Sequence, residues 1–388
     1  MKSSRSKLKS ISMGGSVLII VFLLMEIVLR LLNITGRNEE ELLIPIVRNS
    51  ICYKDYAPGS TFVRKPEPVD EFDPVLNEIN SIGIRGPELG MKTVSRVLNI
   101  GDSFVQAEEV EFDKTFGELL NQRLDGKMEF ISHGISSWAP TPIFSWIHHK
   151  GIQLDLDEVN LFICINDFYR KDRYVGADGD YRDAANYDGD IPVSYSVPAE
   201  NSLKSRVKKV IAGIELIRLP MLVKKRLDAS AAAKRNSDGS AQDKDMKKRV
   251  EAEILERSVE EWPPDLRSSV DDTLGVIVNL NKYLAANGIT LRVLIVPLGL
   301  AWEDEVPVQR ERLGLADGAT IGQTGFANYV LRVLRDESSI LTYRLWEDFD
   351  RFKASNPGEP LFFRADGHWN ERGHALVASI LEGFVNEK

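Results

Sequence analysis

The stretch VSRVLNIGDSF, from Val94 to Phe104, decides the fold. Its segment VLNI is a short apolar run, which is typical of a strand that is buried on both faces of a parallel sheet. The run ends abruptly in Gly101-Asp102-Ser103, and such a sheet binds its ligands at the carboxyl ends of its strands. The sequence therefore predicts a buried strand that delivers Ser103 to the ligand-binding edge of a sheet.

The rest of the chain alternates short apolar segments with amphipathic ones. The segments MEFIS, EVNLFICIN and ITLRVLIVP are typical of buried strands, whereas KTFGELLNQRL and VDDTLGVIVNLNKYLAANG are typical of helices. Strands and helices that alternate in this way form a parallel sheet with helices on both faces. We therefore expect an α/β protein, namely a three-layer α/β/α sandwich around a central parallel sheet of about five strands.

Residues 168 to about 262 interrupt the alternation, and we expect them to form an insertion with helical parts. The insertion opens with turn-rich Gly, Asp, Tyr and Pro residues, and its residues 228–245 have the low complexity of a flexible linker. Between these, residues 203–227 carry basic side chains around an apolar stripe. This basic stretch fits a helix that packs on the domain by its apolar face. The alternatives are a helix on an anionic surface or a cover over the active-site mouth.

The N-terminus predicts a membrane anchor. Lysine or arginine occupies four of the first ten positions, and the mainly apolar residues 11–34 that follow are long enough to cross a bilayer as a helix. The cations place residues 1–10 in the cytoplasm, so an extended lead-in of residues 35–93 and the sheet domain of residues 94–388 would lie outside it. A cleaved signal peptide would need a small-residue site after the apolar run, which is missing, and a buried core helix is the other alternative.

Composition narrows the classes of function. The formal net charge of -9, with no long basic block to offset it, argues against nucleic acid as a partner. Two cysteines, Cys52 and Cys164, are too few for a disulfide framework or a thiolate metal cage. We expect no metal, because the adjacent His148 and His149 point to different faces of a helix. We expect no cofactor, because no phosphate-binding or dinucleotide-binding glycine motif is present.

Polar residues follow the predicted strands at points that would meet on one edge of the sheet. A serine becomes a strong nucleophile when a histidine removes its proton and a carboxylate orients that histidine. Ser103, His368 and Asp366 supply this set. The oxyanion of a tetrahedral intermediate also needs hydrogen-bond donors, and the candidates are the backbone N–H groups of Ser103 and Gly134 and the side-chain amide of Asn166. We therefore predict a catalytic triad and an oxyanion hole.

Each candidate also has a structural interpretation. Ser103 fits the N-cap of the helix that follows it, and Asn166 and Asp167 fit a turn. The presence of all the candidates together favours the catalytic interpretation. His374 lies within the last predicted helix, and we expect it to have a structural or capping role. Whether His133 lines the site or packs in the core is left open by the sequence.

Four segments together resemble the blocks of the GDSL/SGNH hydrolase superfamily, in the family's order: NIGDSF, SHGISSWAPT, FICINDF and RADGHWNERGHALVA. The resemblance covers about residues 94–384, and NSIGIRGPE, residues 80–88, resembles the lead-in of membrane-anchored members. The resemblance implies a flavodoxin-like fold and ester chemistry through a Ser–His–Asp triad. It also implies an oxyanion hole made by Ser103, Gly134 and Asn166.

Two positions depart from the family pattern. Cys164 stands where the third block usually has glycine, although Asn166 is still present. Asp366 and His368 are separated by one residue, where the family usually has two. With Trp369, this spacing is similar to that of alginate O-acetyltransferase-like proteins.

The resemblance implies a serine esterase that acts on O-acyl esters, above all O-acetyl esters. The substrates would be small molecules or cell-surface or exported glycans. An O-acetyltransferase that modifies a polysaccharide is the first alternative. A catalytically silent binding or scaffold protein is the second, although the complete set of Ser103, Gly134, Asn166, Asp366 and His368 argues against it.

Overall fold

The computed structural model describes residues 25, 26, 28, 45–66, 71–169, 185–195, 259–302, 304–313 and 324–386. The chain divides into two units, and the elements below belong to the second, residues 44–197 and 247–388. Within the described part of the chain, no helix has the length and apolar character needed to cross a membrane. The predicted anchor, residues 11–34, lies almost entirely outside the described residues. Residues 203–245, with the basic stretch and the linker, lie wholly outside them.

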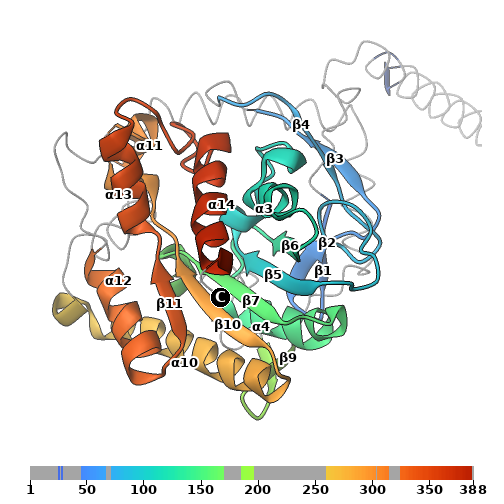
Figure 1. Ribbon diagram of the computed structural model, residues 1–388, viewed down its shortest axis with the longest axis vertical. Coiled ribbons are helices and arrows are strands. Elements are labelled where there is room, and N and C mark those ends of the chain that lie inside the picture. Colours follow the sequence, from blue (N-terminus) through green and yellow to red (C-terminus); the bar gives the residue numbers. More distant parts are fainter. Residues whose placement is uncertain are drawn as a thin grey trace, which may run out of the picture. The chain divides into compact units, whose positions relative to one another are not determined.

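A five-stranded parallel sheet forms the centre of this unit (Figure 1). Its strand order is β11-β10-β7-β5-β6, and all four neighbouring pairs are parallel. In chain order this is 2-1-3-4-5, the doubly wound order of flavodoxin-like folds. The bounds are β5 Ser95–Gly101, β6 Met128–Gly134, β7 Glu158–Ile163, β10 Thr290–Ile295 and β11 Leu341–Arg344. The predicted α/β sheet of five parallel strands is therefore confirmed.

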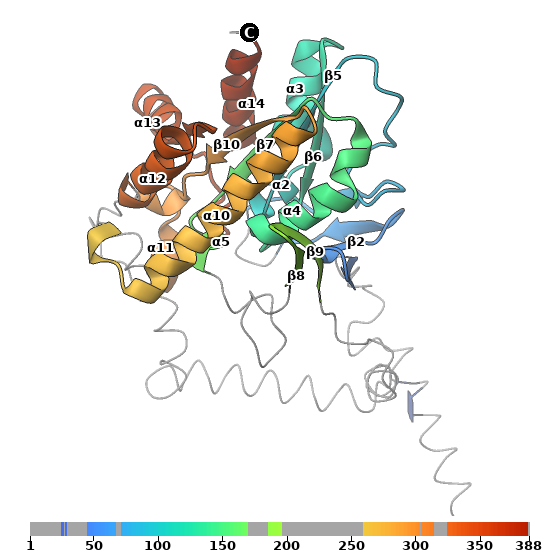
Figure 2. The same ribbon diagram turned by 90° about the horizontal axis from the view of Figure 1, so that it is seen from below.

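Helices cover both faces of the sheet (Figures 1 and 2). On one face α3 packs against α14, and on the other α4 packs against α10. The α-helices are α2 Ser103–Gln106, α3 Phe116–Leu124, α4 Pro140–His149, α5 Asn166–Tyr169, α10 Pro264–Ala286, α11 Pro307–Leu313, α12 Thr324–Leu331, α13 Trp346–Ser355 and α14 Glu371–Asn386. Shorter helical turns are η1 Phe112–Lys114, η2 Gly151–Leu154, η3 Val259–Glu261, η4 Gly299–Ala301 and η5 Arg332–Glu337.

The inner strands of the sheet are covered on both faces, and most of their buried residues are apolar. All six residues of β7 are buried, and so are six of the seven residues of β5. Burial of this kind, at about 25 cal/mol per Å² of apolar surface, is the main favourable term in folding. The short apolar runs of the sequence are therefore sufficient to predict the inner strands.

The lead-in is folded onto the sheet domain. It forms two antiparallel hairpins, β1 Ile46–Asn49 with β2 Tyr53–Tyr56 and β3 Thr61–Arg64 with β4 Val75–Glu78. The hairpins and the residues beside them contribute fully or nearly fully buried side chains to the main core, including Cys52, Tyr56, Phe62 and Ile79. The lead-in thus shares its hydrophobic core with the predicted catalytic domain.

One hairpin of the predicted insertion lies among the described residues. Strand β8, Ala185–Asp188, pairs with β9, Ile191–Tyr195, and β9 contacts α4. Tyr195 is buried in the main core, and its backbone N–H donates to the carbonyl of Ser50 in the lead-in. This part of the insertion therefore packs on the same domain as the lead-in.

Candidate active site

Ser103 lies at the corner where β5 ends and α2 begins. The N-cap of α2 is Asp102, whose Oδ1 accepts the backbone N–H of Phe104 at 3.0 Å. The structural interpretation of Ser103 as the N-cap is therefore wrong, because the preceding carboxylate already fills that position. The Ser103 hydroxyl is available for another partner.

The partner of Ser103 is His368, from a turn 265 residues further along the chain. Its Nε2 lies 2.7 Å from Oγ of Ser103, and its Nδ1 makes a close hydrogen bond with Oδ1 of Asp366. The same carboxylate oxygen accepts the backbone N–H of His368 at 3.1 Å. Gly367, with φ of 85°, makes the tight turn that lets a carboxylate two positions before the histidine reach its ring.

Charge around His368 favours its protonated form. Burial lowers the pKa of His368, but the adjacent Asp366 carboxylate outweighs burial and, with Glu109 and Asp102, raises that pKa to about 9. Burial works against the ionised form of Asp366 as well, yet His368 lowers the pKa of that carboxyl below its ordinary value. The pair therefore favours an ionised Asp366 beside a protonated His368.

Gly134 and Asn166, the other predicted donors, lie around the same corner. Gly134 ends β6 opposite Gly101, and a Cβ at Gly134 would lie 2.5 Å from the backbone nitrogen of Gln106 and collide with the carbonyl of Asp102. Only glycine therefore lets β6 pack this tightly against the helix that carries Ser103. The Asn166 side chain, which is 7% exposed, places its Nδ2 3.5 Å from Oδ2 of Asp102.

The turn after β7 explains how Asn166 is presented. Asp167 accepts the backbone N–H of Cys164 at 2.7 Å through its Oδ2, which closes the turn at the end of the strand. Cys164 is fully buried at the position where the family pattern has glycine. Asp167 is therefore a turn residue. Asn166 points toward the corner of the predicted nucleophile.

A second carboxylate, Glu109, lies beside the triad and carries no sequence signal. Its side chain, Asp366 and His368 each place a donor atom within 4.8 Å of the others. Glu109 is 9% exposed and pairs with Arg64 of β3, whose Nε lies 3.2 Å from Oε1. The side chains of Glu109, Asp366 and His368 are close enough to one another to hold a metal ion. Both ring nitrogens of His368 already contact Ser103 and Asp366, so a metal would have to displace one of these contacts.

A cleft of about 700 Å³ is lined in part by Glu109, which lies beside Asp366 and His368. Phe363, which lines the cleft, donates its backbone N–H to the carbonyl of His368 at 2.8 Å and so connects the cleft to the triad. Phe72 packs against the Phe363 ring at 5.5 Å between centroids. The other lining residues are mainly charged or polar, and they include Glu71, Asp73, Glu109, Glu111, Lys114, Asn370, Glu371 and Arg372.

The remaining histidines contact protein groups instead of the cleft. The buried His374 accepts the backbone N–H of Phe116 at 3.3 Å through Nδ1, and burial lowers its pKa to about 3. His148 lies 3.1 Å from the hydroxyl of Tyr283, and His149 contacts the carbonyl of Val193. The structure thus supports the structural role expected for His374.

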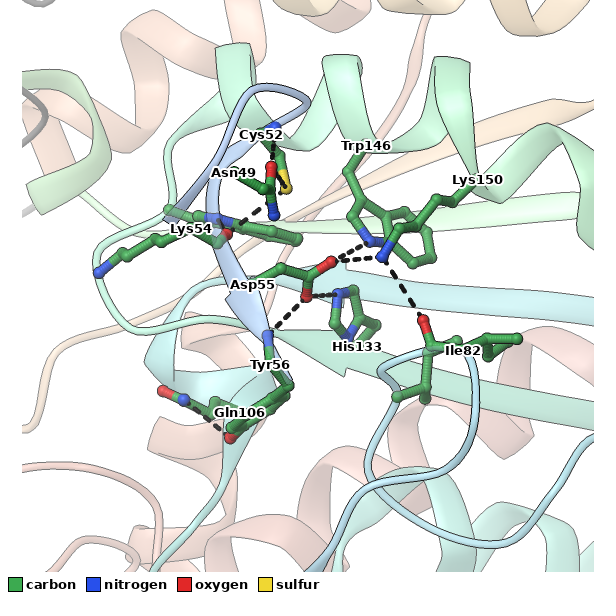
Figure 3. Close-up of polar contacts among 12 residues, drawn as sticks. Asn49, Cys52, Lys54, Asp55, Tyr56, Ile82, Gln106, His133, Trp146 and Lys150 are labelled. Carbon is green, nitrogen blue, oxygen red and sulfur yellow. Dashed lines mark hydrogen bonds and ion pairs between the residues drawn. The ribbon is translucent and has the colours of Figure 1, made fainter. Parts of the chain in front are cut away.

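His133 belongs to a buried polar cluster with the lead-in (Figure 3). Its Nε2 lies 3.3 Å from Oδ1 of Asp55 on β2, whose carboxylate also accepts from Trp146 at 3.2 Å and from Lys150 at 2.7 Å. Burial opposes the charge of Asp55, but His133 and Lys150 hold the pKa of this carboxyl below its ordinary value. His133 therefore packs in the core and joins β6 to the lead-in.

Only the comparison with solved structures found proteins similar to this chain. No protein-family profile matches the chain, and no curated protein matches it. Similar solved structures include the acetyl xylan esterase AlAXEase, 14% identical over 75% of this chain and 99% of that one, with a TM-score of 0.39. A GDSL-like lipase from Bacteroides thetaiotaomicron is 12% identical over 76% of this chain and 88% of that one, with a TM-score of 0.37. A lipolytic G-D-S-L family protein from Veillonella parvula is 12% identical over 75% of this chain and 98% of that one, with a TM-score of 0.35.

Identities and TM-scores this low carry no argument about activity. The chemical argument therefore rests on the geometry of Ser103, His368 and Asp366. The fold itself is established by the strand order of the sheet.

Proposed function

We propose that this protein is a serine esterase of the SGNH type, which cleaves O-acyl esters through an acyl-enzyme. The observation that most supports the proposal is the 2.7 Å contact between Ser103 Oγ and His368 Nε2, with Asp366 on the other ring nitrogen. Acyl transfer by a serine requires a nucleophile, a base within hydrogen-bond distance and a carboxylate that orients the base.

The chemistry follows from these positions. His368 takes the proton of Ser103 as Oγ attacks the ester carbonyl, and Asp366 stabilises the imidazolium that forms. The carbonyl oxygen becomes an oxyanion, for which the backbone N–H groups of Ser103 and Gly134 and the amide of Asn166 are the proposed donors. His368 then gives its proton to the leaving alkoxide oxygen, and the alcohol departs. Water attacks the acyl-enzyme by the same proton exchange, which releases the carboxylic acid and restores Ser103.

The cleft beside the triad supports a hydroxyl-rich substrate. Its carboxylates accept hydrogen bonds from sugar hydroxyls, and the rings of Phe72 and Phe363 offer an apolar wall. O-acetyl esters of small molecules or of cell-surface or exported glycans are therefore the proposed substrates. With residues 11–34 as a membrane anchor, the catalytic domain would face such substrates outside the cytoplasm.

Transfer of the acetyl group to a polysaccharide is the second candidate. The single residue between Asp366 and His368, followed by Trp369, favours it on resemblance. Purified protein given an acetyl donor and an oligosaccharide forms acetylated sugar in the transferase version. It forms free acetate alone in the esterase version.

The first test is covalent labelling with a fluorophosphonate probe. We expect the protein to be labelled at Ser103 and to hydrolyse p-nitrophenyl acetate, and Ser103→Ala to lose both activities. Ser379→Ala is the matched control, because Ser379 lies on the exposed side of α14 and bonds to the carbonyl of Ala375. Folded protein that is neither labelled nor active would support the silent binding or scaffold protein instead.

A further inference from the structure

We propose that Glu109, held by Arg64, is a positioning residue that acts on His368 as a second carboxylate beside Asp366. This inference rests on the proposed esterase function, because it assigns a task to a group that lies beside the catalytic base and acts through it. The task is to favour the protonated imidazole after it has taken the proton of Ser103.

The geometry of Glu109 supports this role. Its carboxylate, Asp366 and the His368 ring place their donor atoms within 4.8 Å of one another, and the Glu109 side chain is 9% exposed. At such a distance a charge that is mostly out of water acts on its neighbour far more strongly than it would at the surface. A carboxylate here therefore stabilises the positive charge of His368.

Arg64 forms an ion pair with Glu109 in this nearly dry position. Nε of Arg64 lies 3.2 Å from Oε1 of Glu109. The guanidinium carbon of Arg64 also lies over the Phe72 ring, 5.8 Å from the ring centroid. Burial lowers the pKa of Arg64, but the negative charge of Glu109 outweighs it and raises that pKa. Arg64 belongs to β3, so the lead-in supplies the cation that fixes this carboxylate.

The other charges around His368 come from three places. Asp366 lies in its own turn, and Asp102 caps α2 beside Ser103. Glu108 acts on Arg64 together with Glu109, and both carboxylates act on Arg85; Glu108 also accepts a hydrogen bond from Tyr56 at 2.7 Å. His374 on α14 also faces this region, and its depressed pKa leaves it neutral. Glu109 and Arg64 are thus an opposite pair whose two charges act on His368 in opposite directions.

Opposite charges predict opposite shifts in the pH profile. His368 must be neutral to act as a base, so kcat/KM rises with pH as His368 loses its proton. Glu109→Gln removes a negative charge, and we expect the midpoint of this rise to fall by about one pH unit, with about ten-fold lower kcat/KM on the plateau above the midpoint, because the imidazolium of the transition state loses the same stabilisation. Arg64→Gln removes a positive charge, and we expect the midpoint to move upward.

The experiment measures kcat/KM for p-nitrophenyl acetate from pH 6 to pH 10 with the full-length protein. Glu337→Gln and Arg332→Gln are the matched controls, because these residues form an exposed Arg–Glu pair in η5 and should leave the midpoint unchanged. If both Glu109→Gln and Arg64→Gln lower kcat/KM at every pH without moving the midpoint, their role is structural and the inference is overturned.

A second measurement separates this inference from the proposed function. The chain has five histidines, so the ring of His368 can be followed by ¹⁵N NMR after histidine labelling. Protein that shows no turnover in any variant contradicts the esterase. The NMR titration of His368 still supports the Glu109 inference if its midpoint falls in Glu109→Gln, and contradicts it if the midpoint stays in place.

Discussion

Asn166 lies beside Asp102, next to the predicted nucleophile, because β7 ends at Ile163 and its turn is closed by Asp167. We expect Asn166→Ala to lower kcat by about 10²–10³, the usual loss when one oxyanion donor is removed. KM should change little, because the lost bond forms chiefly in the transition state. Steady-state kinetics with p-nitrophenyl acetate measures this, with Asn287→Ala at the end of α10 as the control. A loss of less than ten-fold in Asn166→Ala would exclude its amide from the oxyanion hole.

The residues of the candidate site differ in how well their roles could be predicted from the sequence. Ser103, Asp366 and His368 stand in short motifs, and the order of the strands brings these motifs to one corner. Glu109 and Arg64 could not be predicted, because a buried charge looks the same in sequence as an exposed one. Their roles depend on a tertiary contact between two side chains that lie 45 positions apart in the sequence.

At the scale of elements, α14 carries a histidine that makes the fold sensitive to acid. In the folded state, burial lowers the pKa of His374 to about 3, whereas the unfolded chain titrates near 6.5. Between these values the unfolded state binds the extra proton, so stability is lost as the pH falls below about 6.5. Between pH 6.5 and pH 5 the free energy of unfolding falls by about 2 kcal/mol through this one group.

His374→Asn should remove this acid sensitivity. The amide oxygen of asparagine can still accept the backbone N–H of Phe116, and it does not titrate. We expect the free energy of unfolding in urea to fall less between pH 6.5 and pH 5 in the variant than in the unaltered protein. His149→Asn is the control, and an equal fall in all three proteins would contradict the assignment. His368 does not interfere, because its raised pKa alters stability only between about 6.5 and about 9, where stability falls as the pH rises.

The inner strands could be predicted and the lead-in strands could not, for a physical reason. Strand β7 is buried along its whole length, and it ends in the apolar run Leu161–Ile163, because both of its faces are covered. Strands β2 and β3 have four residues each, and polar residues such as Asp55 and Arg64 interrupt them. Their burial depends on packing against the finished sheet, which no short window of sequence records.

At the scale of the whole molecule, the lead-in behaves as part of the sheet domain. A protein that starts at residue 45 keeps the two hairpins, whereas one that starts at residue 94 loses the buried side chains of Tyr56 and Phe62 and the partner of Glu109. Removal of one large buried side chain costs about 3–5 kcal/mol, so the loss of several exceeds typical total stability.

We therefore expect the protein that starts at residue 45 to unfold cooperatively and to keep esterase activity. The protein that starts at residue 94 should be insoluble or lack a cooperative thermal transition. Circular dichroism melting of the two forms measures this difference. A folded, active protein without residues 1–93 would show that the lead-in is dispensable.

The long separation between Ser103 and His368 has a consequence for the timing of synthesis. The chain is made from its N-terminus, and the sheet strands β5, β6 and β7 emerge well before residue 368. A chain still attached to the ribosome would hold its nucleophile without a base, and so could not cleave esters in the compartment where it is made. Activity would begin only when the turn that carries His368 packs beside the end of β5. Ester cleavage would therefore show that folding is complete.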